Sequence, residues 1–407
     1  MKCRHCNKEL TYSLIDLGFA PPSNAYLEKK DLSKPEKYYP LRVKVCDHCW
    51  LVQTEDYAQA DELFNADYAY FSSTSSTWLE HARSYARMIT GKLNLSEKSL
   101  VVEIASNDGY LLKNFVEWNI PCYGIEPTDS TAEAAKRFNI PVIKRFFGES
   151  LAQELAQDRK KADLVIGNNV YAHVPDINDF TKGLKTILKD AGVITLEFPH
   201  LLNLLKYNQF DTIYHEHFSY LSLTSVQNIF SEFGLRVFNI EKLPTHGGSL
   251  RIYGCHVSDP RSTDDSVNIL LQEETEFGLH DANTYTSLQA RADLIKNELL
   301  IFLLEAKKNS KSIGAYGAAA KGNTLLNFAG LKTDLIQFVC DAAESKQGKF
   351  LPGSHIPIVS PEYLGECRSD YLIILPWNIA DEVVRQNRAL KDAGTMFVKF
   401  IPETEFV

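Results

Sequence analysis

The sequence predicts a three-part α/β protein, with an N-terminal zinc-binding module, a central Rossmann-like domain and a smaller C-terminal α/β Rossmann-like domain. Three observations predict it: two C-x-x-C pairs in the first 49 residues, an alternation of strands and helices from residue 99 onward, and a second strand–turn–helix unit after residue 310. Because 407 residues exceed one ordinary hydrophobic core, several domains are expected. We place them at residues 1–66, 67–282 and 311–407, with a connecting helix over 283–310.

The composition is that of a soluble globular protein, with 44% hydrophobic and 23% charged residues. The net charge of -9 and the lack of a long basic run argue against an extended nucleic-acid surface. The start, MKCRHCNKEL, lacks the apolar core of a signal segment, and no apolar stretch is long enough to span a membrane. Four of the eight cysteines are paired and four are single, which suits a reducing cytoplasm. We therefore expect a cytoplasmic protein that binds neither nucleic acid nor membrane.

The N-terminal knuckles, Cys3-x-x-Cys6 and Cys46-x-x-Cys49, have the spacing of a tetrahedral zinc site. Each C-x-x-C turn presents two thiolates to one ion, and Zn²⁺ takes four ligands. His5 and His48 lie inside the knuckles, so a mixed Cys/His set is an alternative, although four cysteines are simpler. A redox pair is disfavoured because there are two knuckles and no thioredoxin-like surroundings. We predict a structural zinc.

An aromatic connector that contains Tyr68 and Tyr70 leads into a helix predicted over Trp78–Leu93, where apolar residues recur every three or four positions. The serine and threonine cluster before this helix is suited to cap it. The two tyrosines have two interpretations: ordinary packing between module and core, or a connector that folds over a bound ligand.

The central unit begins with an apolar β-branched run, Leu100–Val102, which predicts a buried strand. A polar turn over 105–109, a helix with apolar spacing and a second strand, Cys122–Ile125, follow, and that strand ends in Glu126. This is half of a nucleotide-binding βαβ unit, in which the terminal acid accepts hydrogen bonds from ribose hydroxyls.

The turn is not G-x-G-x-x-G, and it aligns better with the acid-x-G-x-G-x-G turn of S-adenosylmethionine-dependent methyltransferases. Glu103 supplies the acid and Gly109 the last glycine, while Ala105 and Asn107 replace the other two. Alanine is small and asparagine tolerates left-handed backbone angles, so the turn can survive. An ordinary α/β turn is the alternative.

The alternation continues with a strand over Asp163–Ile166, whose carboxyl end carries Asn168 and Asn169. Ligand contacts are expected at that end of an open α/β sheet. His173 follows in a loop and is a candidate site residue, although a lone loop histidine is often inert.

A second informative stretch, FDTIYHEHFSYLSL, places Tyr214, His215, Glu216 and His217 side by side. In an extended segment Tyr214 and Glu216 would share one face, and the two histidines the other. A metal site is an alternative, but H-x-H with one acid lacks a clear third ligand. We favour general acid–base chemistry, for which a histidine with a near-neutral pKa is suited.

The C-terminal part begins after a long helical pattern over Asn283–Lys308. In KSIGAYGAAAKGN, a strand carrying Tyr316 precedes a small-residue turn and a helix entrance with Lys321 and Asn323. Backbone N–H groups and a lysine at a helix entrance suit a diphosphate. Trp377 and Asn378 lie at the carboxyl end of a later strand and complete the predicted substrate-binding set.

Together these stretches resemble the bacterial C-methyltransferases that build branched deoxysugars from nucleotide-linked 4-ketosugars. The resemblance covers essentially the whole chain, and Y-H-E-H-F-S-Y is its most specific part. It implies S-adenosylmethionine as cofactor and methylation of a carbon next to the ketone, with C3 of a 4-keto-6-deoxyhexose as the default. The nucleotide base, the sugar and the oligomeric state are not fixed by the sequence, and a monomer is the default.

The resemblance also implies roles for matching residues. Cys3, Cys6, Cys46 and Cys49 resemble the zinc ligands, and Glu103 to Gly109, Glu126, Asn168 and Asn169 the cofactor site. His217 resembles the base that removes the proton next to the ketone, with Tyr214 and Glu216 as companions and His173 and Tyr68 facing the same pocket. Lys321 and Asn323 resemble diphosphate contacts.

The chemistry supports this interpretation, since a carbon–carbon bond to a sulfonium methyl needs a carbanion, which a neighbouring ketone makes accessible. His217 would be the base, and Tyr214 or protonated His173 would donate to the enolate oxygen. One alternative is an NAD-dependent nucleotide-sugar oxidoreductase or epimerase, which predicts a Y-x-x-x-K pair that we do not find. Another is a non-catalytic zinc-ribbon protein that binds a nucleotide sugar.

Overall fold

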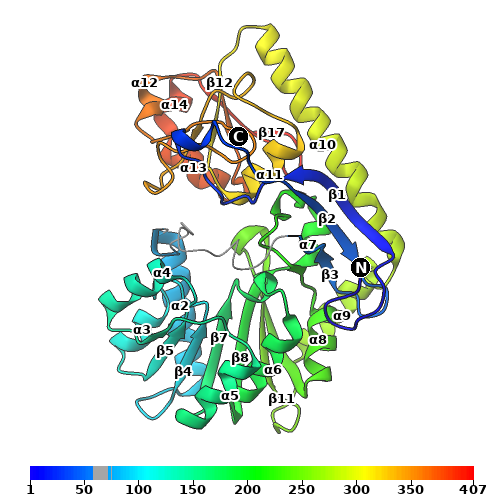
Figure 1. The fold of residues 1–407 in the computed structure, drawn as a ribbon, viewed down its shortest axis with the longest axis vertical. Coiled ribbons are helices and arrows are strands. Elements are labelled where there is room, and N and C mark those ends of the chain that lie inside the picture. The colour runs from blue at the N-terminus through cyan, green and yellow to red at the C-terminus, as the bar shows by residue number, and fades with distance from the viewer. Residues whose placement is uncertain (58–71, 75) are drawn as a thin grey trace.

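The computed structural model describes residues 1–57, 72–74 and 76–407. Its strands form sheets of four, seven and six strands, which belong to the N-terminal module, the central domain and the C-terminal domain. The central and C-terminal domains form two lobes, and the N-terminal sheet lies beside them along a long helix (Figure 1). Within the described ranges, no helix combines the length and the apolar composition that crossing a membrane requires.

The N-terminal sheet contains β1 (Tyr12–Ala20), β2 (Tyr39–Val45) and β3 (Val52–Thr54), all antiparallel. Alternate residues of β2, among them Leu41 and Val43, are buried, as expected for a sheet with one covered face. Its last strand is β9 (Ser219–Tyr220), which belongs to the central part of the chain and pairs with β3. The module is therefore completed by the stretch that holds the predicted base.

The central sheet has the order β10-β11-β8-β7-β4-β5-β6, and its strands are parallel except for β11. The strands are β4 (Val101–Ile104), β5 (Cys122–Ile125), β6 (Val142–Ile143), β7 (Ala162–Asn168), β8 (Leu188–Pro199), β10 (Leu235–Leu243) and β11 (Ser249–His256). The order reverses between β4 and β7, so their carboxyl ends form the crevice where open α/β sheets bind ligands.

Helices cover both faces of this sheet (Figure 1). They are α2 (Ser76–Leu93), α3 (Leu112–Glu117), α4 (Asp129–Ala135), α5 (Glu149–Asp158), α6 (Ile177–Ile187), α8 (Leu223–Glu232) and α9 (Asp265–Phe277). Helix α7 (Leu201–Lys206) packs instead in the core that the module shares with the C-terminal domain. Val101 packs in a core with α2 and α3, whereas its neighbour Val102 packs in another core with α5, α6 and α8. The unbroken apolar run of β4 is explained by this burial on both faces.

The C-terminal sheet has the order β14-β13-β12-β15-β16-β17, and only the last pair is antiparallel. It contains β12 (Ile313–Tyr316), β13 (Val339–Cys340), β14 (Ile358–Val359), β15 (Tyr371–Ile374), β16 (Met396–Lys399) and β17 (Glu405–Phe406). The helices of this domain are α11 (Ala320–Phe328), α12 (Tyr363–Glu366), α13 (Ala380–Gln386) and α14 (Arg388–Asp392). Its order reverses between β12 and β15, which places Lys321 and Asn378 at a second ligand-binding crevice.

The long helix α10 (Ala282–Lys308) joins the two lobes and packs against β1. Its buried residues, such as Leu288 and Leu299, belong to a core that also contains Leu14 and Val43 of the module and Leu326 of the C-terminal domain. The module and the C-terminal domain therefore share one hydrophobic core, although the central domain separates them in sequence.

Candidate functional site

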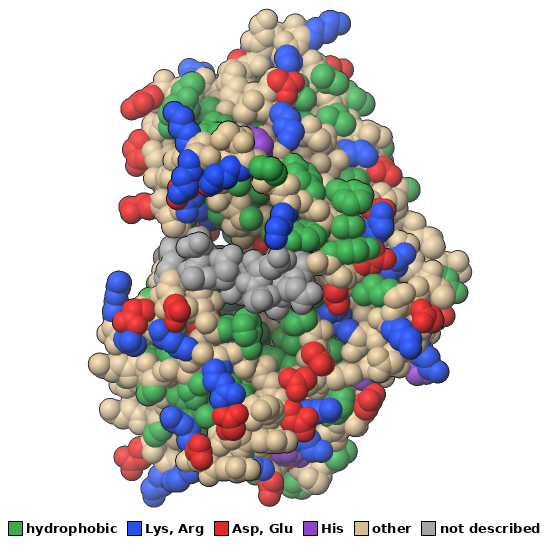
Figure 2. Space-filling view, viewed as in Figure 1, with side chains coloured by type: hydrophobic (Ala, Val, Ile, Leu, Met, Phe, Trp, Pro, Cys, Tyr) green, Lys and Arg blue, Asp and Glu red, His purple; other side chains and the backbone are tan. Residues whose placement is uncertain are grey.

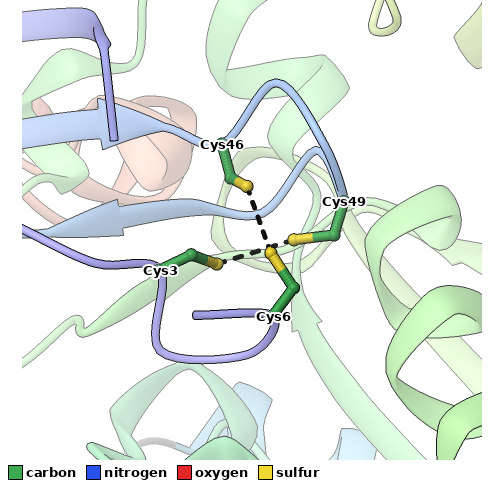
Figure 3. A group of neighbouring side chains, drawn as sticks. All are labelled: Cys3, Cys6, Cys46 and Cys49. Carbon is green, nitrogen blue, oxygen red and sulfur yellow. Dashed lines mark hydrogen bonds between the residues drawn. The ribbon is translucent and has the colours of Figure 1, made fainter. Parts of the chain in front are cut away.

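The four cysteines of the two knuckles come together at one end of the N-terminal sheet. Their sulfurs point towards one another and all lie within 4.8 Å of each other (Figure 3). The sulfurs of Cys3 and Cys49 are 3.6 Å apart, and those of Cys6 and Cys46 are 3.5 Å apart. Sulfurs around a tetrahedral zinc with bonds of about 2.3 Å lie about 3.8 Å from one another, so the set fits one ion.

The two knuckle histidines lie outside this set. Nδ1 of His5 is 2.8 Å from Oδ1 of Asn178 on α6, and His48 is exposed. The Gln53 amide donates a 3.2 Å hydrogen bond to the sulfur of Cys3 and so orients this ligand from β3. The structure supports the four-cysteine site over the mixed Cys/His alternative.

The turn after β4 adopts the backbone that the sequence predicted for a cofactor loop. Ala105, Asn107 and Gly109 have φ angles of 55°, 50° and 79°, so all three adopt the left-handed region. The Asn107 side chain also accepts a 2.9 Å hydrogen bond from the backbone N–H of Ser72, just before α2. Alanine and asparagine therefore adopt the left-handed backbone that glycine adopts readily.

Carboxyl groups surround this turn. Glu126, at the end of β5, accepts 2.9 Å hydrogen bonds from the backbone N–H groups of Asn107 and Thr128. Glu103 is buried, and its two carboxyl oxygens have no hydrogen-bond partner among the described residues. Burial, with the nearby charges of Asp108 and Glu126, raises the pKa of Glu103 well above its usual range. A positively charged ligand group would relieve this cost.

Asn168 ends β7 beside this turn, and both polar atoms of its side chain are buried without a hydrogen-bond partner among the described residues. The next residue, Asn169, has a φ of 52° and its amide lies 3.3 Å from Nε2 of His246. The two asparagines therefore lie at the predicted edge of the sheet, where the unpaired Asn168 amide is available to a ligand.

The stretch from Tyr214 to His217 is a tight turn, and the prediction of an extended segment was wrong. The backbone N–H of His217 donates a 2.9 Å hydrogen bond to the carbonyl of Tyr214. The turn brings the Tyr214 and His217 rings together, with centroids 4.0 Å apart, whereas Glu216 and His215 are directed towards other partners. A period-two alternation fails because the chain reverses before it enters β9.

The buried ring of His217 and the half-buried ring of His173 form a pair, with centroids 4.6 Å apart. Nδ1 of His217 donates a 2.8 Å hydrogen bond to the Thr212 carbonyl, and Nδ1 of His173 donates one of 2.8 Å to the Glu216 carbonyl. A carbonyl only accepts, so the neutral rings carry their proton on Nδ1 and present Nε2 as a proton acceptor.

Both histidines are neutral at pH 7. Burial lowers the pKa of His173 to about 4, and burial together with the neighbouring His173 lowers that of His217 well below its usual range. The unprotonated His217 ring can accept a proton as the predicted base, although its pKa lies below the near-neutral value expected from the sequence. The lowered pKa of His173 argues against a protonated His173 as the donor to an enolate oxygen.

Glu216 does not contact the His217 ring as a hydrogen-bonded companion. Its carboxyl group is buried and accepts a 3.1 Å hydrogen bond from the side chain of Asn24, in the N-terminal module. Its contribution to the histidine pair is its backbone carbonyl, which orients His173.

The C-terminal domain contributes a lysine that is anchored at the entrance of α11. Nζ of Lys321 donates a 2.6 Å hydrogen bond to Oδ1 of Asn378 and lies 4.7 Å from the ring centroid of Trp377. The Trp377 indole donates a 2.7 Å hydrogen bond to Asp211 of the central domain. Burial lowers the pKa of Lys321 and raises that of Asp211 to about 6. The two lobes therefore meet through a half-buried polar bridge.

Two other predicted substrate residues have different surroundings. Asn323 is buried and both polar atoms of its side chain lack a hydrogen-bond partner among the described residues, which leaves them available to a ligand. Tyr316 instead packs in an apolar core with Phe338 and Leu372. Tyr68, the last predicted pocket residue, lies outside the described residues.

Sequence reasoning missed two residues of this region, His246 and Asp211. His246 has a φ of 54° and lies between Asn169 and Trp78. The ring centroids of His246 and Trp78 are 5.2 Å apart. A histidine followed by two glycines was a signal for a special turn, but nothing local indicated its neighbours. Asp211 carried no sequence signal at all, because its partner Trp377 lies 166 residues away.

Models of known protein families match the chain in three consecutive blocks. They describe a zinc binding domain over residues 3–64, a methyltransferase domain over 78–240 and a C-methyltransferase C-terminal domain over 244–402. The C-methyltransferase NovU of Streptomyces niveus is 32% identical over 406 residues, which cover 100% of this chain and 96% of NovU. The chain belongs to the C-methyltransferase family.

Solved methyltransferase structures also match a part of the chain. Magnesium protoporphyrin IX methyltransferase from Synechocystis PCC 6803, solved with bound SAM, is 15% identical with a TM-score of 0.34, over 44% of this chain and 79% of that one. A sarcosine dimethylglycine methyltransferase from Galdieria sulphuraria is 11% identical with a TM-score of 0.36, over 44% of this chain and 86% of that one.

As a C-methyltransferase, the protein uses S-adenosylmethionine and holds a structural zinc ion. The residues fit both groups: the four sulfurs have tetrahedral spacing, and the buried, unpaired polar atoms of Glu103 and Asn168 suit a ligand that carries positive charge and many polar atoms. The family assignment also decides against the oxidoreductase and the non-catalytic alternatives.

Proposed function

We propose that this C-methyltransferase methylates the carbon next to the ketone of a nucleotide-linked 4-keto-deoxysugar, with C3 as the expected position, in branched-sugar biosynthesis. One observation carries the proposal: a neutral histidine pair lies between a cofactor-type crevice in one lobe and a lysine-bearing crevice in the other. Bound S-adenosylmethionine supplies an electrophilic methyl group.

His217 would remove the proton from the carbon next to the ketone. Its Nδ1–H is held by the Thr212 carbonyl, so Nε2 is the basic atom. The low pKa of this buried ring keeps it unprotonated at neutral pH, as a general base requires. His173 lies next to it, so the proton taken up by His217 would be close to a second basic nitrogen.

Tyr214 is the preferred donor to the enolate oxygen. Its ring lies against that of His217, which would place base and donor on the same part of a substrate. A neutral hydroxyl donor in a buried site stabilises developing negative charge without a prior change of protonation. We therefore assign this role to Tyr214 rather than to His173.

Lys321 and Asn323 would bind the nucleotide diphosphate. Lys321 lies at the entrance of α11, at the point where the strand order of the C-terminal sheet reverses, and is held by Asn378 above Trp377. Basic side chains also gather on the edge of this lobe that borders the central domain, on the face shown in Figure 2. A cation at such a crevice favours an anionic substrate.

The test is a mass-spectrometric assay with S-adenosylmethionine and a panel of nucleotide-linked 4-ketosugars, run in deuterated water. We expect a methyl mass gain on one class of sugar, and deuterium exchange next to the ketone even without cofactor. Exchange without methylation would assign His217 to a different overall reaction. Neither signal on any sugar, in protein that still binds the cofactor, would overturn the substrate class.

A further inference from the structure

The N-terminal module is joined to the catalytic stretch by backbone pairing. Strand β3 pairs with β9, with Val52 opposite Tyr220 and Gln53 opposite Ser219. Gln53 is also the residue that donates to the Cys3 sulfur, so the strand next to the metal site is the strand that holds the end of the Tyr214–His217 turn. A module that only stabilised its own fold would not need this pairing with a strand of the central part of the chain.

Thr54 extends the contact to the predicted base. Its hydroxyl donates a 3.1 Å hydrogen bond to the carbonyl of His217, and its backbone N–H donates one of 3.1 Å to the carbonyl of Phe218. Thr54 is buried, as is His217. The backbone of the base is therefore fixed from the module, while its ring is fixed by Thr212 of the central domain.

Asn24 makes the corresponding contact to Glu216. Its amide donates a 3.1 Å hydrogen bond to Oε1 of Glu216. The other carboxyl oxygen of Glu216, Oε2, is buried without a hydrogen-bond partner among the described residues. The loop that carries Asn24 is itself held, because the Tyr26 hydroxyl donates a 2.6 Å hydrogen bond to the Ala318 carbonyl in the turn after β12. Module, catalytic turn and C-terminal crevice therefore meet at Glu216.

We propose that the zinc module is a working part of the catalytic site, in which Asn24 and Thr54 are positioning residues for Glu216 and His217, and the second oxygen of Glu216 accepts a hydrogen bond from a hydroxyl of the sugar. The proposal rests on the proposed C-methylation and adds a specific role for the module. A buried, half-paired carboxyl group is costly unless a ligand completes its hydrogen bonds.

The first experiment is a double-mutant cycle on the full-length, zinc-loaded protein. Asn24→Ala should lower kcat/KM for the ketosugar about 10-fold, the effect of one lost hydrogen bond to a buried carboxyl group. In a Glu216→Ala background, which removes the acceptor of this hydrogen bond, the same change should have little further effect. An equal loss in both backgrounds would overturn the assignment of Asn24.

Thr54→Val tests the contact to the base, with Thr11→Val as the matched control because Thr11 is exposed on the same module. We expect Thr54→Val to lower kcat about 10-fold with little change in KM or in the dissociation constant for S-adenosylmethionine, since only the base is displaced. Thr11→Val should retain full activity. A parallel loss of cofactor binding in Thr54→Val would indicate a general folding defect and would overturn the positioning role.

A measurement without substrate separates this proposal from the proposed function. A ¹³C NMR titration of the Glu216 carboxyl should show a pKa about one unit higher in Asn24→Ala than in the wild type, because the carboxylate loses a donor while it stays buried. An unchanged pKa would overturn the positioning of Glu216 by Asn24. A shifted pKa in a protein that methylates no ketosugar would overturn the proposed function but leave the positioning role of Asn24 standing.

Discussion

The central and C-terminal domains have the same strand order around their reversal point, but they offer ligands opposite charges. In the order β6-β5-β4-β7-β8 and in the order β14-β13-β12-β15-β16, the turn after the innermost strand faces the crevice. The central crevice contains Glu103 and Glu126, whereas the C-terminal crevice contains Lys321. One arrangement of backbone therefore serves a cationic cofactor on one side, and suits an anionic substrate on the other.

The second strand of each domain ends in an acid that braces the turn after the first. Glu126 accepts from the N–H of Asn107, and Asp341 accepts a 2.8 Å hydrogen bond from the N–H of Ala318. The two acids differ in how their negative charge is compensated. Nζ of Lys346 lies 3.4 Å from a carboxyl oxygen of Asp341, whereas burial raises the pKa of Glu126. The shared acid thus braces the same turn in both domains, whereas Lys346 compensates its charge in the C-terminal domain.

The largest effect is expected at the histidine pair between the two crevices. We expect His217→Asn to lower methyl transfer by about 10³-fold, the usual contribution of a general base. Cofactor binding, measured by calorimetry, should be unchanged because the cofactor turn lies on other elements. Full activity in this variant would show that the base lies elsewhere.

Removing one charged side chain from each crevice should separate the functions of the two crevices. Lys321→Met should raise KM for the nucleotide sugar about 10- to 100-fold, and Glu126→Gln should weaken S-adenosylmethionine binding by a similar factor, since each loses charged hydrogen bonds. Each variant should leave the other ligand's affinity nearly unchanged. If either variant weakens both ligands equally in binding assays, the two crevices do not act independently.

The bridge between the lobes should make stability depend on pH. The folded-state pKa of Asp211, about 6, lies above its usual value, so the folded state binds this proton more tightly and the contribution to stability is lost as pH rises from about 4 to 6. Asp211→Asn, which keeps an acceptor for the Trp377 indole, should remove a loss of at most about 3 kcal/mol over this window. Denaturant unfolding at pH 4 and pH 7 measures it, and an unchanged difference between the two pH values would contradict the prediction.

The smallest effect is expected from the backbone of the two turns. Ala105→Gly should raise the free energy of unfolding by up to about 1 kcal/mol, because a left-handed alanine is strained. The reverse change in the other domain, Gly317→Ala, should destabilise by about 2 kcal/mol. There φ is 92° and a Cβ would lie 2.4 Å from Pro376 Cδ. Equal thermal unfolding of Ala105→Gly and wild type would show that the alanine is accommodated without strain.

The sequence by itself determined the features that depend on neighbouring residues. The spacing of Cys3, Cys6, Cys46 and Cys49 predicted a site that the structure assembles, and the left-handed backbone at Asn107 agrees with the local preference of asparagine. Apolar periodicity likewise predicted the helix over 283–308, which is α10 over Ala282–Lys308. In each case the interactions that decide the conformation lie within a few residues, or within a motif of fixed geometry.

Only the tertiary structure decided how these parts meet. The turn at Tyr214–His217, the contact of Asn24 with Glu216 and the bridge from Asp211 to Trp377 depend on partners that are distant in sequence or on a chain reversal with no glycine or proline signal. The face pattern expected for an extended Tyr214–His217 segment did not hold, because nothing in the local sequence indicates where the chain must turn to reach its partners. The local sequence therefore predicted that Glu216 and His217 are functional residues, but long-range packing decides where they lie.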